Sequence, residues 1–343
     1  MDKLNKPSKL LLIVALLVLL VIGGGVLTLR SWYERNLAAV SVSGVNQYFT
    51  VVSGSSLHQI ALKLKSAGLI RSPRAFETYT RSNELPDKLQ AGTYSLSPSM
   101  SVGGIVKKIV AGEVAKNLLT ILPQKRLDEI KQAFAGAGYS GPQIEAAFDP
   151  ASYRGHQALS SLPPGASLEG YLYPDSFEKQ ADTPATQIIR ESLDLMQKYL
   201  GPDVVNGFAT HSLNVYQGMT LASIVAKETD DPKYQPIVAQ VLLLRLARGM
   251  PLQADVTSFY ASVVAGQPKS LSIDSPYNTH THTGLPPGPI SNMTYDALGA
   301  VAHPANTDYL YFVAGDDEKI HFSRTVTEHN DAVAKYCQKK CQL

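Results

Sequence analysis

The sequence predicts an α+β protein behind a single N-terminal transmembrane helix. Residues 10–29 contain no charged side chain, and strand-like and helix-like patterns alternate from Gln47 onward. A chain of 343 residues also suits about two domains behind an anchor. Hydrophobic residues make up 44% of the chain and charged residues 17%, which is typical of a globular protein and not of a disordered one.

The charge of the chain argues against nucleic acid as a partner. The sequence has 31 basic and 29 acidic residues, which gives a formal net charge of +2. The first nine residues account for all of this excess, through Asp2, Lys3, Lys6 and Lys9. Everything after them sums to zero, whereas a nucleic-acid-binding protein needs an excess of positive charge.

Residues 10–29 are the predicted membrane span. Their only polar side chain is Thr28, and a helix of this length covers about 30 Å, the thickness of a bilayer core. Lysines precede the run and no small-x-small cleavage site is evident, which favours an uncleaved signal anchor. We therefore expect a cytoplasmic stub over 1–9, although Arg30 and Arg35 weaken this orientation without reversing it.

A linker over 30–46 and a small domain over 47–115 are expected next. Its elements are a strand over 47–52, a helix after Ser56, a helix that begins at Ser72-Pro73, a strand over 89–96 and a helix capped by Ser101. The first helix places Leu57, Ile60 and Leu64 on one face, and Gly68 suits the position after its end. No titratable cluster is present, so the domain is expected to bind or to act as a spacer.

Residues 116–336 are expected to form the larger domain, followed by a tail over 337–343. Its expected elements are a strand over 118–122, two short helices before 148, a loop over 151–166, an aromatic stretch over 168–177, a helix over 183–200, the helix that contains Glu228, a helix over 234–248, an irregular loop over 275–290, a strand over 309–314 paired with 321–323, and a polar C-terminal helix.

Glu228 is the candidate catalytic residue. Leu221, Ile224 and Val225 recur at helical spacing and define an apolar face. Glu228 continues this series, whereas Lys227 points away from it. A glutamate forced toward a core is desolvated, which raises its pKa and keeps it protonated near neutral pH. Such a group suits a general acid that cleaves a glycosidic bond.

The ends of this helix also carry sequence signals. Asn214 and Gln217 form a capping-box pattern at its start, and Asp231 before Pro232 indicates its end. An ordinary explanation stays open, because a glutamate at a helix end also pairs with a basic residue such as Lys227. Arg245 is a second possible partner.

Metal ions and cofactors are not expected. His280 and His282 would share one face of a strand, but no third ligand lies at a suitable spacing. Cys337 and Cys341 lack nearby histidines, which makes a poor metal site. They could form a disulfide in an oxidising compartment, although their i,i+4 spacing on a regular helix is near the upper Cα limit. We expect two exposed tail residues.

Several separated motifs occur together in collinear order. They are Gln90-Ala-Gly-Thr-Tyr94, Leu168-Glu-Gly-Tyr-Leu-Tyr-Pro-Asp175, Leu221-Ala-Ser-Ile-Val-Ala-Lys-Glu-Thr229, Gln253-x-Asp255-x-Thr257, Ser275-Pro-Tyr-Asn-Thr279, Gly284-Leu-Pro-Pro-Gly-Pro-Ile290 and Tyr309-Leu-Tyr-Phe-Val313. Together they resemble the MltG/YceG-like family of membrane-anchored endolytic murein transglycosylases of bacteria. The resemblance covers roughly residues 45 to 336.

The resemblance implies a fold, a site and a location. Residues 47–115 correspond to a LysM-like subdomain that binds peptidoglycan, and residues 116–336 to the catalytic domain. Glu228 would be the catalytic acid, and the residues expected to bind the sugar or orient Glu228 are Asn278, Tyr277, Gln253, Asp255, Thr257 and Glu169. A single-pass protein of the bacterial inner membrane is implied, with the catalytic domain outside the cytoplasm and cell-wall synthases as candidate partners.

The chain departs from the family pattern at three places. Ala226 stands where a second glutamate is usual, which leaves Glu228 as the only acid of its motif. Val256 replaces a proline, and Leu122-Pro-Gln-Lys-Arg126 replaces Pro-Glu-Gly at the junction between subdomains. None of these changes removes the proposed acid.

Two other functions remain open at this stage. A peptidoglycan hydrolase would pair Glu228 with a second carboxylate, for which Asp255, Glu169 and Asp175 are candidates. A non-catalytic protein would instead anchor a cell-wall synthesis complex to peptidoglycan. The three functions differ in their products: anhydro ends, hydrated ends or none.

Overall fold

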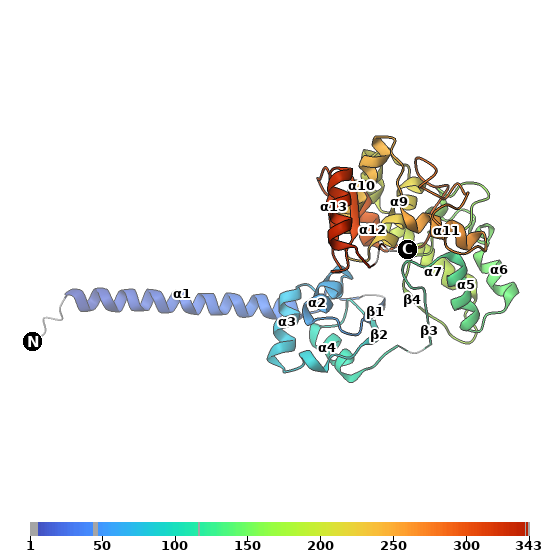
Figure 1. Cartoon of the computed structure of the whole chain (residues 1–343). Coiled ribbons are helices and arrows are strands. Elements are labelled where there is room, and N and C mark those ends of the chain that lie inside the picture. The colour runs from blue at the N-terminus through green and yellow to red at the C-terminus, as the bar shows by residue number, and fades with distance from the viewer. Residues whose placement is uncertain (1–5, 44–46, 116, 340, 342–343) are drawn as a thin grey trace, which may run out of the picture. The chain divides into compact units, whose positions relative to one another are not determined.

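The computed structural model describes residues 6–43, 47–115, 117–339 and 341 (Figure 1). The chain divides into two compact units, Met1–Lys116 and Asn117–Leu343. We call them unit 1 and unit 2 and describe each by itself. Residues 1–5 of the expected stub and residues 44–46 of the expected linker lie outside the described residues.

The N-terminal helix α1 (Lys6–Leu37) has 32 residues and contains the whole predicted span of residues 10–29. It continues to Leu37, so residues 30–37 are helical where we expected the start of a linker. Most side chains between residues 6 and 22 are outside the described set. In what is described, no helix is long and apolar enough to cross a membrane.

The globular part of unit 1 combines helices with a two-stranded sheet. Strands β1 (Gln47–Val51) and β2 (Gly92–Leu96) pair antiparallel, with Phe49 opposite Tyr94. The helical elements are α2 (Leu57–Ser66), α3 (Pro73–Ser82), η1 (Pro86–Lys88) and α4 (Val102–Ala111). This order confirms the strands and helices that the sequence predicted here, apart from the short η1 turn.

Local capping explains where these helices begin and end. Ser56 forms a complete capping box at the start of α2, and Ser101 accepts a hydrogen bond from the backbone N–H of Gly104 at the start of α4. Ser72 caps α3, whose first residue is Pro73. Gly68, with a φ of +70°, follows the end of α2 in the left-handed conformation expected of it.

Unit 2 is mostly helical. Its elements are β3 (Leu118–Thr120), α5 (Leu127–Gly136), α6 (Gly141–Phe148), η2 (Pro150–Tyr153), η3 (Gln157–Leu159), β4 (Ser176–Glu178), α7 (Ala185–Tyr199), α8 (Pro202–Thr210), α9 (Val215–Glu228), α10 (Gln235–Ala247), α11 (Asp255–Val264), α12 (Tyr295–Ala302), β5 (Tyr311–Ala314), β6 (Ile320–Ser323) and α13 (Val326–Tyr336). β3 pairs antiparallel with β4, and β5 with β6.

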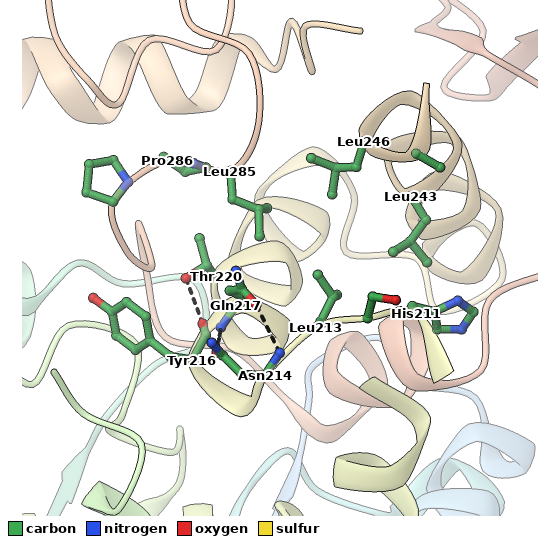
Figure 2. A pocket seen from close by; sticks show the side chains of 13 residues that line it. His211, Leu213, Asn214, Tyr216, Gln217, Thr220, Leu243, Leu246, Leu285 and Pro286 are labelled. Atoms are coloured by element: carbon green, nitrogen blue, oxygen red, sulfur yellow. Dashed lines mark hydrogen bonds between the residues drawn. The ribbon is translucent and has the colours of Figure 1, made fainter. Parts of the chain in front are cut away.

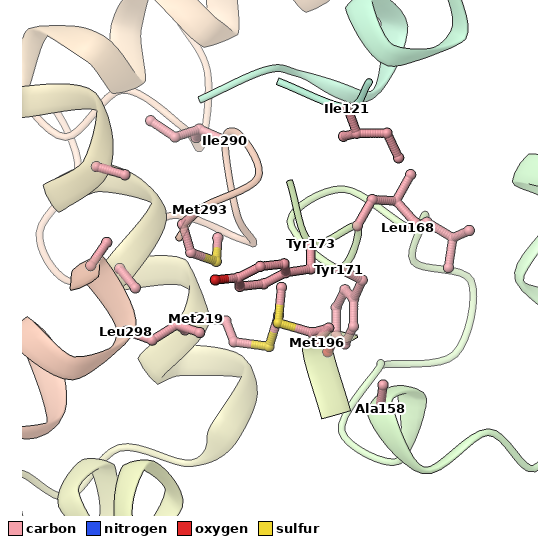
Figure 3. Packing of buried hydrophobic residues seen from close by; sticks show 14 of the residues in the cluster. Ile121, Ala158, Leu168, Tyr171, Tyr173, Met196, Met219, Ile290, Met293 and Leu298 are labelled. Carbon is pink, nitrogen blue, oxygen red and sulfur yellow. The ribbon is translucent and has the colours of Figure 1, made fainter. Parts of the chain in front are cut away.

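Helix α9 runs through the middle of unit 2. Every residue from 218 to 226 is buried, and α8, α10, α11 and α12 all pack against the helix. Gly218 allows α8 to approach, because a Cβ at this position would overlap the ring of Phe208. The core continues to one side of α9, where Tyr171 and Tyr173 join Met219 and Met293 (Figure 3).

Several elements of unit 2 differ from the sequence prediction. Helices α8 and α12 were not predicted. Helix α12 is buried over most of its length, so it lacks a clear amphipathic period. Residues 255–264 form a helix, so Val256 lies in α11 and not in a loop. His280 and His282 lie in consecutive turns and not on a strand. Their spacing of two residues therefore does not place both side chains on one face of a strand, as we had expected.

The C-terminal cysteines also differ from expectation. Cys337 and Cys341 form a disulfide, with their Cα atoms 5.5 Å apart. Helix α13 ends at Tyr336, so both cysteines lie beyond the helix. Their Cα atoms are therefore not held at the i,i+4 distance of a regular helix, which is near the upper limit for a disulfide. Cys337 is only 4% exposed, so it belongs to the folded unit and not to an exposed tail.

Candidate functional site

Glu228 is the last residue of α9. The predicted capping box is present at the other end, where Asn214 and Gln217 bond to each other's backbone N–H. The helix ends at Glu228, three residues before the predicted Asp231, and Thr229 is extended. A carboxylate in the last turn faces the negative end of the helix dipole, which disfavours its charged form.

The carboxyl of Glu228 is desolvated and unpaired. Its Oε1 is buried and accepts no hydrogen bond from any described residue. Burial raises the pKa of Glu228 to about 8, the negative charge of Asp255 adds to this rise, and the positive charge of Arg245 opposes it. Glu228 therefore holds its proton at neutral pH, as the sequence predicted from its position on the apolar face.

The ion-pair explanation of Glu228 does not fit the structure. Among the described residues, neither Lys227 nor Arg245 forms a salt bridge with it. Lys227 is half-buried and donates to the backbone oxygen of Gln124 at 3.4 Å. The guanidinium of Arg245 instead donates hydrogen bonds to the backbone oxygens of Leu310, Pro251 and Leu252 and to the side-chain oxygen of Gln253.

Glu228 opens onto a cavity of about 580 Å³ in unit 2. The walls come from the ends of α9 and α11, from α10, from the β5–β6 hairpin and from α13 with the C-terminal disulfide. Three of the predicted site residues line this cavity together, namely Glu228, Gln253 and Asp255. Two histidines that the sequence did not single out as site residues, His280 and His329, line it as well.

Asp255 and His280 form a pair beside Glu228. Asp255 begins α11, and its Oδ1 lies 2.8 Å from Nε2 of His280. The hydrogen bond fixes the carboxylate of Asp255, and both side chains are partly buried. The only sequence signal for His280 was its place directly after the Ser275–Thr279 motif.

Gln253 adopts a strained backbone conformation at the cavity wall. Its φ is +52°, a value that is uncommon for any residue other than glycine. The backbone N–H donates to the oxygen of Thr279 at 3.0 Å, and the side-chain oxygen accepts from Arg245 at 3.2 Å. Gln253 is exposed and lines the cavity. Strain of this kind is often kept at functional sites.

Asn278 and Thr257 lie inside the protein. Asn278 is fully buried: its amide donates to the oxygens of Leu271 and Ile273, and its Oδ1 accepts from Ser258. Thr257 is fully buried too and donates to the backbone oxygen of Ala254. These bonds hold the 271–280 loop against α11. Because their polar groups are used in this way, Asn278 and Thr257 are better placed to support the site than to bind the sugar directly, and their predicted role stays a prediction.

Glu169 and Tyr277 belong to a different part of unit 2. Glu169 accepts from the backbone N–H of Leu127, the first residue of α5, and from the hydroxyl of Tyr260 at 3.4 Å. Burial raises the pKa of Glu169 to about 7. The ring of Tyr277 packs on Tyr260, with centroids 4.9 Å apart. Glu169 lines a separate cavity of about 370 Å³ with Arg126.

A third cavity, of about 650 Å³, lies at the other end of α9 (Figure 2). Its walls include Asn214 and Gln217, the C-terminal part of α10 and the Leu285–Pro287 segment. It is larger than the Glu228 cavity, but among the described residues that line it none is a carboxylate. Since α9 separates the two by its length of about 20 Å, Glu228 is not part of it.

Residues 49–335 match the YceG-like family. The chain belongs to this family. A relative is the endolytic murein transglycosylase of Bacillus subtilis strain 168, which is 32% identical over 341 residues that cover 94% of this chain and 92% of that protein. The endolytic murein transglycosylase of Streptococcus pneumoniae strain D39 is 31% identical over 328 residues, and the match covers 86% of this chain and 59% of that protein.

A solved structure supports the YceG-like fold. The crystal structure of a putative yceG-like protein from Listeria monocytogenes has a TM-score of 0.56 and 31% sequence identity to this chain. The similarity covers 84% of this chain and 99% of that one. The sequence resemblance to the MltG/YceG-like family is thereby confirmed, and with it the mixed helix-and-strand class of the fold.

Proposed function

We propose that this chain is an endolytic lytic transglycosylase of peptidoglycan. The observation that carries the proposal is the desolvated carboxyl of Glu228 at a cavity wall, whose Oε1 is buried without a partner among the described residues and whose pKa is raised by burial. The names of the relatives, endolytic murein transglycosylases, support peptidoglycan as the substrate. Termination of nascent glycan strands would follow from endolytic cleavage.

The proposed chemistry needs one carboxyl group. Glu228 protonates the oxygen of the β-1,4 bond between N-acetylmuramic acid and N-acetylglucosamine, so that this bond breaks. The resulting glutamate takes the proton of the muramoyl C6 hydroxyl, whose oxygen attacks C1. The product is a 1,6-anhydromuramoyl end, Glu228 is protonated again, and no water is consumed. Proton transfer of this kind contributes roughly 10²–10⁴-fold to a rate.

The predicted binding residues take different roles in this proposal. Gln253 and Asp255 line the Glu228 cavity and are proposed to contact or orient the sugar. Tyr277 and Glu169 remain predicted sugar contacts at their own position, where an aromatic ring lies near a buried carboxyl. Asn278 and Thr257 are placed to hold the loop that carries His280.

A two-carboxylate hydrolase is the second candidate, because Asp255 shares the cavity with Glu228. In that mechanism a second carboxylate activates water or forms a glycosyl-enzyme intermediate. The product would then have hydrated, reducing ends. Glu169 lines a separate cavity, and Asp175 is not among the described residues that line the Glu228 cavity, so both are weaker partners for Glu228. A non-catalytic anchor of a synthesis complex would give no product at all.

Glu228→Gln separates these functions. Glutamine keeps the size and hydrogen-bonding reach of the side chain but cannot supply or recover a proton. We expect near-normal binding of glycan strands and at least about a 10²-fold loss of anhydro-muropeptide release, measured by mass spectrometry of digested peptidoglycan. Anhydro ends at the wild-type rate from this variant would rule out the mechanism. Hydrated ends from the wild-type protein would favour the hydrolase.

We also propose a membrane anchor over residues 10–29 and a peptidoglycan-binding role for residues 47–115, the predicted LysM-like subdomain. The uncharged run and the preceding lysines support a single-pass protein of the bacterial inner membrane, with the rest of the chain outside the cytoplasm. This place would bring cell-wall synthases within reach as partners. A reporter enzyme that is active only in the cytoplasm should be silent when fused after Leu343. Reporter activity there would contradict the proposed topology.

A further inference from the structure

One wall of the Glu228 cavity is a single stripe of helix α13. Val326, His329 and Val333 follow the i, i+3, i+7 spacing of one helical face, and Cys337 continues it just beyond the helix. All four line the cavity. None of the residues of α13, which is described throughout, is fully buried. The helix therefore covers the cavity as an outer wall and does not contribute to the core.

The imidazole of His329 is held in a fixed orientation on this wall. It stacks on the ring of Tyr311, with centroids 5.4 Å apart and planes 26° apart. Tyr311 in turn lies over the guanidinium of Arg245 at 5.0 Å. Arg245 is fixed by its own hydrogen bonds to backbone oxygens. The ring of His329 is therefore positioned by stacking, and within the described part of the chain its Nδ1 has no hydrogen-bond partner.

Two polar atoms that are buried and have no hydrogen-bond partner among the described residues belong to side chains that line this cavity from different walls. One is Oε1 of Glu228, at the end of α9, and the other is Nδ1 of His329, on α13. The charge of Arg245 acts on both side chains, which places both near the same guanidinium. Buried polar atoms are normally paired, so two such atoms on side chains that line one cavity point to a polar ligand in that cavity.

We propose that His329 contacts the substrate, through a hydrogen bond between its Nδ1 and a hydroxyl or acetamido group of the glycan bound against Glu228. The proposal rests on the proposed function and assigns a substrate-contacting residue outside the family motifs described above. It makes α13 a wall of the substrate cleft.

The electrostatics of His329 favour a neutral group of the sugar over an anion. Burial lowers the pKa of His329, and the nearby charge of Arg245 lowers it further. The imidazole is therefore neutral near pH 7 and offers one N–H donor and one acceptor nitrogen. Hydroxyl and amide groups, which can both donate and accept, match such a ring. A carboxylate group of a ligand would be bound better by a positively charged side chain than by a neutral imidazole.

The end of α13 is tied to the β5–β6 turn, so the wall is rigid. The backbone N–H of Asp316 donates to the oxygen of Tyr336 at 2.6 Å, and its side chain accepts from the backbone N–H groups of Gln338 and Lys339. The ring of Tyr336 stacks on His321 at 3.7 Å. A rigid support of this kind keeps a contacting side chain in place.

Binding by variants without turnover tests the proposal. In the full-length Glu228→Gln protein, His329→Phe keeps a ring that can stack on Tyr311 but removes both nitrogens. We expect this double variant to bind a GlcNAc–MurNAc tetrasaccharide about tenfold more weakly than Glu228→Gln alone. His329→Asn, which returns an amide near the position of Nδ1, should recover most of the loss. Asn330→Ala, on the exposed face of α13, is the matched control and should bind normally.

The outcomes separate this proposal from the proposed function. Unchanged binding by the His329→Phe variant, or no recovery with His329→Asn, would overturn the contact. His329→Ala provides a second deletion if the phenylalanine variant has a lowered melting temperature. Hydrated ends from the wild-type enzyme would remove the transglycosylase mechanism and leave the binding comparison to decide on His329. No binding by Glu228→Gln itself would count against both.

Discussion

In the proposed mechanism, Glu228 must hold a proton when the glycan binds. Its pKa of about 8 means that roughly nine-tenths of the enzyme is in this form at pH 7. Because the acid form is the active one, kcat/KM should fall as the pH rises through about 8. Asp255→Asn removes a negative charge that raises this pKa, so the alkaline limb of the profile should move to lower pH. A limb that stays in place would show that Asp255 does not act on Glu228.

His280 and His282 provide a matched pair for testing how Asp255 is held. His280 bonds to Asp255 at 2.8 Å, whereas His282 is exposed and contacts the hydroxyl of its neighbour Thr281. We expect His280→Ala to lower kcat/KM about tenfold, or ~1.4 kcal/mol, because Asp255 loses its fixed orientation. His282→Ala should have no effect. Equal losses in the two variants would point to damage of the whole loop.

The residues of the site illustrate what the sequence could reveal. Glu228 was predictable because its helical spacing to Leu221 and Val225 places a carboxyl among apolar neighbours. His280 and His329 were not, since nothing in the local pattern shows that a turn and a distant helix meet at one cavity. Asn278 was expected to bind the sugar or orient Glu228 because the Ser275–Thr279 motif resembles that of the family. The fold buries it, and its amide holds the loop together.

At the scale of elements, the predictions succeeded where the signal is local. Capping at Ser56, Ser101 and Asn214 depends on side chains that bond to the backbone three residues away. The buried face of α11 consists of Thr257, Ser258, Ala261 and Ser262, so it lacks an apolar period. Helix α12 depends on burial among other helices, which the local sequence does not encode as a period. The disulfide was unclear for the same reason, because it requires α13 to end at Tyr336, before Cys337.

At the scale of the whole molecule, the two units have separate hydrophobic cores. The cluster of unit 1 includes Phe76 and Tyr94, that of unit 2 includes Tyr171 and Leu221, and the two clusters share no residue. Each unit therefore has what a domain needs to fold by itself. All the side chains that line the Glu228 cavity come from unit 2. Under the proposed function, this division places the chemistry in unit 2 and leaves unit 1 for the predicted binding to peptidoglycan.

Deletion of residues 1–116 tests this division of labour. Residues 117–343 retain the whole Glu228 cavity and its core, so they should still release anhydro ends from short soluble glycan strands. They should pellet with insoluble peptidoglycan much less than the full chain does, because the proposed binding unit is gone. Full-length Glu228→Gln is the reciprocal control: it should pellet normally and release nothing. If residues 117–343 fold, as judged by a cooperative melting transition, and pellet as well as the full chain, unit 2 alone accounts for binding to the insoluble polymer.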